Sequence, residues 1–175
     1  MSKVNIKYTK QIALMLLSTE REFLDNKVAK CIDEYISRSP SNVWEFDLMI
    51  YFDKGNAESY KKLYEYKKHD CIASVHIHII NIPDFENIYT DKFENEHGGY
   101  IDSVKDSDIR ELGMSSGPNL LFYSSLHHAQ SNHNHVNYMV IESDTHPVKS
   151  NWFDGLFRFS RTNNYTIGGS EYKGQ

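Results

Sequence analysis

The feature that most constrains the fold is the alternation of short apolar runs with amphipathic stretches over the first 83 residues. The apolar runs lie at 11–20, 44–55 and 71–83, and each has the length of a strand that is covered on both faces. Between them, residues 21–39 place apolar side chains three or four positions apart, and residues 56–70 form a second, more polar helical pattern. The alternation predicts an α/β fold: a Rossmann-like, mostly parallel open sheet flanked by helices.

The alternation continues after an acidic interruption. Nine acidic and three basic residues lie between Asp84 and Glu111, and we expect a loop-rich segment there, either a solvated loop or a flap that closes over a ligand. Gly117 and Pro118 then suit the first turn of a helix. The expected later elements are a helix at 117–132, a fourth strand at 136–144, a helix at 148–161 and the start of a strand in 164–175.

Length and composition indicate a single domain spanning residues 1–175. The chain is 39% apolar and 25% charged, which is ordinary for a soluble protein, and its net charge of −5 gives no support to binding of a nucleic-acid backbone. The longest apolar run, Ile12–Leu17, is too short for a transmembrane segment. Cys31 and Cys71 form no CxxC motif, so we expect reduced thiols and a cytoplasmic location.

Three of the predicted strands end in polar or acidic residues. Ligands of open α/β sheets bind outside the carboxyl ends of the strands. Ser18, Thr19 and Glu20 follow the first strand, Asp53 follows the second, and the triplet 142–144 ends the fourth. Within that triplet, Glu142 and Asp144 are two residues apart and would point the same way in an extended chain. Their oxygens suit Mg²⁺ or Mn²⁺, especially when a substrate diphosphate completes the coordination.

The order of elements and the segment "MVIESDTHPVKSNWFDGL" resemble the nucleotide-diphospho-sugar transferases of the GT-A fold. Glu142-Ser143-Asp144 stands where that family has its Asp-x-Asp motif, and "SSGPNLLFYSSL" resembles the segment before the motif strand. The resemblance covers roughly Gln11 to Tyr172. It implies a glycosyltransferase that uses a UDP- or GDP-sugar donor.

The resemblance also implies a set of site residues. Asp144 would bind Mn²⁺ or Mg²⁺ directly, and Glu142 would bind the metal through water or contact the ribose or donor sugar. The residues implied in nucleotide-sugar binding are Leu17, Ser18, Thr19, Glu20, Asp53, Asn119, Glu142 and Ser143.

Members of this family usually extend well past the motif, through strands that bind the acceptor. This chain ends at Gln175, and "IGGSEYKGQ" resembles the entry to the acceptor region. We therefore expect either the N-terminal, donor-binding part of a longer glycosyltransferase or a shortened member of the family whose activity is in question. The donor base and sugar, the acceptor, the catalytic base and the stereochemical outcome stay open.

A second function of the same fold is a nucleotide-sugar-binding or interaction domain without transfer activity. For Glu142 and Asp144 themselves, the alternative to any ligand role is a strand-end turn in which Asp144 caps the helix that follows. His146, two residues after Asp144, is placed to contact a ligand in either case.

A third function, a histidine/carboxylate zinc hydrolase, follows from the nine histidines. His76 and His78 share one face of a predicted strand, and imidazole is a common zinc ligand. A second group comprises His127, His128, His133 and His135. Convergence of the two groups around one cavity would favour this alternative, and scattered positions would exclude it.

Overall fold

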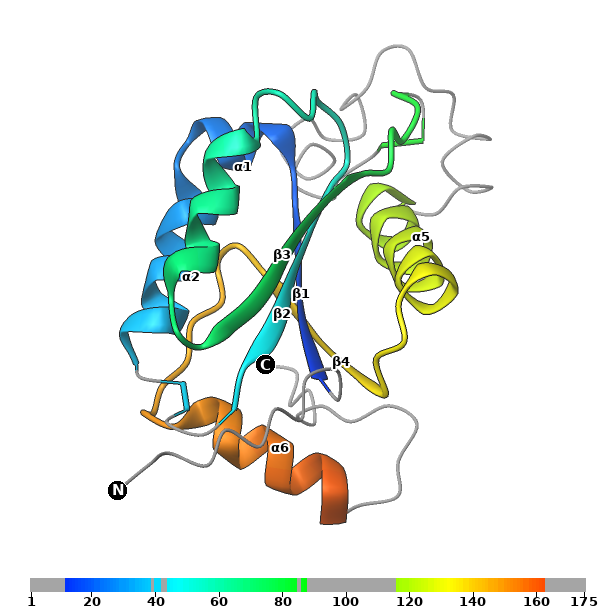
Figure 1. The fold of residues 1–175 in the computed structure, drawn as a ribbon. Helices are drawn as coiled ribbons and strands as arrows, with labels where there is room; N and C mark the ends of the chain where they lie inside the picture. Colours follow the sequence, from blue (N-terminus) through cyan, green and yellow to red (C-terminus); the bar gives the residue numbers. More distant parts are fainter. Residues whose placement is uncertain (1–11, 39, 42–43, 85, 88–115, 163–175) are drawn as a thin grey trace, which may run out of the picture.

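The centre of the molecule is a four-stranded parallel sheet with the strand order β3-β2-β1-β4. The structure is a computed structural model, and it describes residues 12–38, 40–41, 44–84, 86–87 and 116–162. The α/β fold predicted from the sequence is confirmed. The strands are β1 (Ile12–Ser18), β2 (Phe46–Phe52), β3 (Ile72–Ile79) and β4 (Asn137–Glu142) (Figure 1).

Strand β1 is buried along its whole length because neighbours cover it on every side. It pairs with β2 and β4, so that Leu14 lies between Leu48 and Met139. Its even-numbered residues pack into the core on one face of the sheet, and its odd-numbered residues pack into the core on the other face. The unbroken apolar run "IALMLL" is the sequence expected of such a strand.

Helices cover both faces of the sheet (Figure 1). One face carries α1 (Glu20–Leu24), α2 (Lys27–Ser37) and the 3₁₀-helix η1 (Lys61–Lys68), whereas α5 (Ser116–Asn132) lies on the other. The change of face accompanies the reversal of strand order, since β4 pairs with β1 rather than with β3. Right-handed crossovers on opposite sides of the starting strand place their helices on opposite faces.

Two of the predicted helices differ from expectation. The stretch 21–39 forms two helices because Asn26 adopts a left-handed conformation (φ 61°), which Asn tolerates better than most residues. The stretch 56–70 forms turns and η1 rather than an α-helix. Its inward side chains, Tyr60, Leu63 and Tyr66, are three residues apart, which is the period of a 3₁₀-helix.

The fourth strand is shorter than predicted. It ends at Glu142, and Ser143 and Asp144 lie in a turn closed by a hydrogen bond from the Thr145 amide to the Glu142 carbonyl (3.1 Å). The prediction that the chain is extended as far as Asp144 is therefore wrong. The chain then runs back along α2 to α6 (Trp152–Thr162), so Asp144 is also too distant to cap the next helix (Figure 1).

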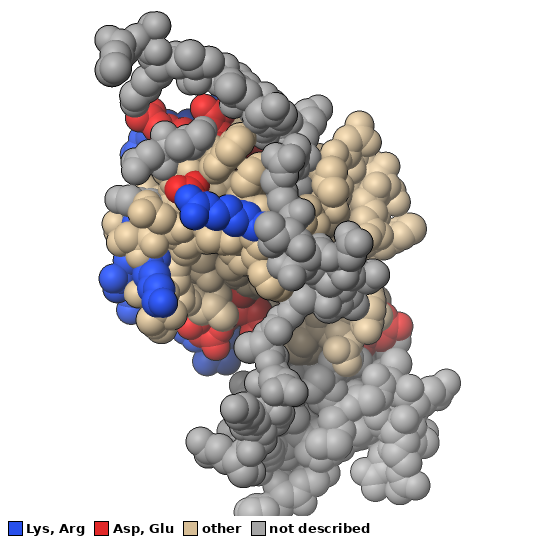
Figure 2. All heavy atoms as spheres, turned by 90° about the horizontal axis from the view of Figure 1, so that it is seen from below, with Lys and Arg blue, Asp and Glu red and all other residues tan. Residues whose placement is uncertain are grey.

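Helix α5 carries no charged side chain, in contrast to the helices on the other face of the sheet. Residues 116–132 contain no Lys, Arg, Asp or Glu, and α5 is tan on the right of Figure 2, whereas acidic and basic side chains gather farther left. None of the helices in the described part of the chain combines the length and apolar character of a membrane span. The predicted strand in 164–175 and most of the acidic segment lie outside the described residues.

Two glycines provide a matched test of this packing. Gly55 has a φ of 117°, and a Cβ there would lie 1.9 Å from the hydroxyl of the fully buried Tyr60. Gly55→Ala should lower the free energy of unfolding by about 1–3 kcal/mol. Gly155 lies within α6 with nothing near its missing Cβ, so Gly155→Ala should raise that energy by about 0.5–1 kcal/mol. Urea denaturation measures both, and changes of the same sign would contradict the described backbone.

Candidate functional site

The strand order creates a crevice between the carboxyl ends of β1 and β4. From β1 the chain proceeds to β2 and β3 on one side, and β4 lies on the other side. The connections that leave β1 and β4 therefore depart in different directions, and α/β proteins bind ligands at this topological switch point. A cavity of about 620 Å³ lies there.

Most of the predicted site residues line this strand-end cavity. Leu17, Ser18 and Thr19 come from the end of β1 and the cap of α1. Asn119 comes from the first turn of α5, and Glu142 and Asp144 come from the end of β4 and the turn after it. Residues 125 positions apart in the sequence, Leu17 and Glu142, are register partners in the sheet. The sheet thus assembles one site from three segments.

Glu22 joins the two sides of the crevice, and the sequence analysis missed it. One carboxylate oxygen accepts hydrogen bonds from the Ser18 hydroxyl (2.9 Å) and from the amide and hydroxyl of Thr19 (3.0 and 3.2 Å). The other oxygen accepts a hydrogen bond from the hydroxyl of Ser143, directly after β4. The signal was present in the sequence, because Thr19 and Glu22 form a capping box, Thr-x-x-Glu, which fixes both residues at a helix start.

The turn after β4 is fixed from its other side by α2. The Cys31 thiol donates to the carbonyls of Glu142 and Thr145 (3.6 and 3.5 Å), and the Tyr35 hydroxyl is 3.3 Å from that of Thr145. Burial, with the nearby carboxylates Glu34, Asp144 and Glu22, raises the pKa of Cys31 to about 12, which keeps the thiol protonated as a donor. The turn that carries Asp144 is therefore held between Glu22 and α2.

Negative charge accumulates at this site. Burial raises the pKa of Glu142, and the charges of Asp144 and Glu22 raise it further. Burial alone would raise the pKa of Glu22 as well, but hydrogen bonds from Ser143, Thr19 and Ser18 lower it overall. Glu22 is thus stabilised as a carboxylate by its own donors, whereas Glu142 faces two like charges and has no such set of donors described. A cation at the cavity would relieve that repulsion.

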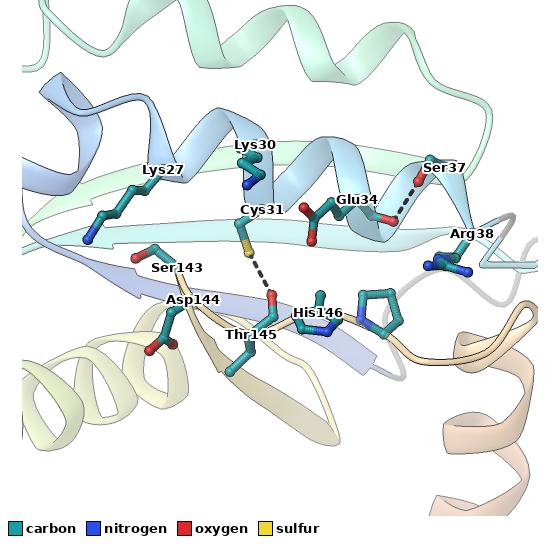
Figure 3. Close-up of a pocket in the computed structure, with 11 residues that line it drawn as sticks. Lys27, Lys30, Cys31, Glu34, Ser37, Arg38, Ser143, Asp144, Thr145 and His146 are labelled. Carbon is teal, nitrogen blue, oxygen red and sulfur yellow. Dashed lines mark hydrogen bonds between the residues drawn. The ribbon is translucent and has the colours of Figure 1, made fainter.

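A second cavity, of about 590 Å³, adjoins the first at Asp144 and carries basic groups. Figure 3 shows Lys27 and Lys30 of α2, and Arg38 directly after it, across this cavity from the segment Ser143–His146, with the carboxylate of Glu34 among them. His146 lines this second cavity and is exposed. Asp144 therefore stands at the boundary between an acidic and a basic compartment.

Two predicted site residues lie elsewhere. Asp53 is 5% exposed, and its two oxygens accept hydrogen bonds from the Glu20 amide (3.0 Å) and the Asn87 side chain (2.8 Å), so it orders the chain after β2 and starts α1. Glu20 is exposed, and neither residue lines either cavity. Ser143 is buried, binds Glu22 and lines the second cavity rather than the first.

The histidines form a separate group on the face of the sheet that α5 covers. His76 and His78 converge with His133, and His128 and His135 lie beside them, whereas His127 is exposed. The two histidine groups therefore converge for five of the six histidines, although none of the described cavities is lined by them.

Comparison with models of known protein families finds no matching family, and comparisons with curated proteins and with solved structures find no match.

Because Glu22 hydrogen-bonds to residues at both strand ends, we expect it to contribute to stability in a pH-dependent way. Glu22→Gln should lower the free energy of unfolding at pH 7 by about 1 kcal/mol, because hydrogen bonds to a charged acceptor are replaced by weaker ones. The folded protein lowers the pKa of Glu22, so its stabilisation is present above its ordinary value of 4.5 and is lost as the pH falls through the folded-state pKa. The difference from wild type should therefore shrink below about pH 4.5, as urea denaturation across this range would measure.

Glu20→Gln is the control for this prediction, because it removes the same charge two residues away at an exposed side chain. A stability difference for Glu22→Gln that grows toward acid pH, or that equals that of Glu20→Gln throughout, would show that Glu22 does not connect the two strand ends.

Proposed function

We propose that the strand-end cavity binds the nucleoside diphosphate of a sugar nucleotide together with a divalent cation, and that the chain is a glycosyltransferase or its donor-binding part. The observation that carries the proposal is the position of Glu142 and Asp144. Both line one cavity at the topological switch point of a parallel sheet, beside residues from the end of β1. The resemblance of Glu142-Ser143-Asp144 to an Asp-x-Asp motif suggests the ligands, a divalent cation and the diphosphate of a sugar nucleotide.

The residues at the cavity fit a hard divalent cation. Mg²⁺ and Mn²⁺ prefer oxygen ligands, and Mg²⁺ in particular is commonly bound by one or two carboxylates while substrate phosphates and water complete its shell. Glu142 and Asp144 supply this number of carboxylates. Burial raises the pKa of Glu142, and the charges of Asp144 and Glu22 raise it further, so a cation beside Glu142 would favour its ionised form.

The start of α5 supports phosphate binding at the same place. Pro118 and Asn119, in the first turn of this 17-residue helix, line the cavity. Helix N-termini favour anions because the first amides lack partners within the helix and the dipole is positive there. The cavity thus has carboxylates that suit the metal ion and a helix N-terminus that suits the diphosphate.

Each part of the chain would contribute to transfer in a distinct way. The cation, when bound, acts as a Lewis acid that stabilises the charge developing on the diphosphate leaving group. Asp144 and Glu142 would hold that ion, and Asn119 would orient the nucleotide from α5. Glu22, Ser143 and Cys31 would act as positioning residues, because they fix the turn that carries Asp144.

The proposal predicts metal-dependent nucleotide binding that depends on Asp144. Calorimetric titration of UDP and of GDP should show binding of at least one nucleotide with Mn²⁺ and its loss with EDTA. Asp144→Asn keeps the size of the side chain but removes its charge, so it should weaken binding at least about tenfold, or about 1.4 kcal/mol. Incubation with the corresponding sugar nucleotide, followed by detection of released diphosphate, then separates an enzyme from a binding domain.

Glu58→Gln is the matched control, since Glu58 is exposed, lies after β2 and pairs only with Lys61 among its described ion pairs. It should bind the nucleotide like the wild type. If neither nucleotide binds, or if binding ignores both EDTA and Asp144→Asn, the donor-site proposal is wrong and the carboxylates serve another purpose.

A further inference from the structure

Strand register brings two histidines together on the face of the sheet that α5 covers. His76 is the register partner of Met49, and His78 is the register partner of Tyr51. Met49 and Tyr51 belong to the core beneath α5, so both imidazoles project toward that helix. Their rings are nearly parallel, with centroids 6.4 Å apart.

The end of α5 supplies the third imidazole. His133 directly follows α5, and its amide donates to the carbonyl of Ala129 (2.9 Å), which fixes it at the helix end. Its ring centroid is 4.7 Å from that of His76 and 5.7 Å from that of His78. One ring nitrogen from each of the three residues lies within 4.8 Å of the others. Among the described residues, these three histidines form the one group of metal-type ligands with such spacing.

The surroundings of His76 orient its ring. The Ser74 hydroxyl donates to Asp47, so it accepts a hydrogen bond from Nε2 of His76 (2.8 Å) and leaves Nδ1 with its lone pair. Asp47 also binds Nε2 of His135 (2.7 Å). A carboxylate that acts on a histidine through a hydrogen bond is the usual outer shell of a metal site, because it fixes the tautomer and the direction of the ring.

His78 has no hydrogen-bond partner for its buried Nε2 in the described structure. Buried polar atoms are normally paired, and an exception needs an explanation. Burial, with the neighbouring rings of His128, His133 and His76, lowers the pKa of His78 to about 4, and burial also lowers the pKa of His76 and of His133. These directions favour neutral imidazole, which is the form that binds metals.

The alternative is that the histidines only pack against one another and against Tyr51. A hydrogen bond accounts for one side of His128, whose Nδ1 is 3.1 Å from the Tyr51 hydroxyl. It does not account for the unpaired Nε2 of His78, nor for the approach of one nitrogen from each of three residues. A bound ion explains both observations together.

We propose that His76, His78 and His133 bind one Zn²⁺ ion, which fastens the C-terminal end of α5 to β3. Three imidazoles suit Zn²⁺ and are poor ligands for Mg²⁺ or Mn²⁺, which take oxygen donors. A fourth ligand completes the tetrahedron that zinc prefers, and His128 is the nearest further imidazole to His78, with ring centroids 4.3 Å apart. This site is distinct from the strand-end carboxylates in its ligands, its metal and its place in the fold.

Zinc binding to untagged, EDTA-stripped protein tests the proposal. Equilibrium dialysis against Zn²⁺ at neutral pH, read by elemental analysis, should give one tightly bound ion per chain, and Zn²⁺ should raise the thermal midpoint because it binds the folded state. His133→Asn should weaken Zn²⁺ binding by more than the roughly 10–100-fold expected for loss of the outer-shell hydroxyl in Ser74→Ala. His133 lies in a connection rather than in a strand, so its substitution leaves the sheet intact.

His127→Asn is the matched control, because it removes an exposed histidine of α5 outside the group. It should bind Zn²⁺ like the wild type. Absence of a tightly bound ion, or equal affinities for His133→Asn and His127→Asn, would overturn the zinc proposal. Asp144→Asn should retain Zn²⁺ while losing Mn²⁺-dependent nucleotide binding, and His133→Asn should do the reverse, so failure of one site is distinguishable from failure of the other.

Discussion

Complete burial of β1 between two parallel neighbours is the constraint on which the rest of the structure depends. A strand that is apolar on both faces needs helices on both faces, and a parallel sheet needs crossovers to place them. With β2 on one side of β1 and β4 on the other, the chain must reverse its direction of travel across the sheet. The crevice beside the end of β1 is a direct consequence of that reversal.

The polar residues at that crevice are held by hydrogen bonds to one another and to side chains of α2. Glu22 accepts hydrogen bonds from the end of β1 and from Ser143 after β4, while Cys31 and Tyr35 of α2 hold the other side of the turn. Such a network fixes Asp144 and Glu142 in spite of the repulsion between them. Carboxylates that hydrogen bonds hold close together in spite of their repulsion are typical of ligand sites.

The histidine group shows a different way of building a site. Its members come from the middle of an edge strand and from the end of a helix, and hydrogen bonds through Ser74 and Asp47 set the direction of His76. The imidazoles lie between the sheet and α5, and α5 carries no charged side chain. The described chain therefore has carboxylate oxygens at the end of the sheet and imidazole nitrogens on one face of it, and the two proposals assign them different metals.

Local sequence patterns determined the elements of this protein and much of the strand-end site. Apolar runs identified the four strands, and the positions after them identified Ser18, Thr19, Glu142 and Asp144, because polar residues that follow a buried strand must lie at its end. Two local signals, however, were overlooked when the helices were predicted. The period of Tyr60, Leu63 and Tyr66 gave a 3₁₀-helix rather than an α-helix, and Asn26 broke the first helix in two.

Only the tertiary structure decided which of these residues meet. The sequence could not show that Asp53 would be buried with both oxygens occupied, since its partners Glu20 and Asn87 are each more than 30 residues away. Likewise, His133 reaches His76 and His78 only because β4 returns to β1 and draws α5 across the opposite face. Spacing along the chain determines the direction of side chains within one element, whereas the register between strands and the crossing of the helix determine which elements share a site.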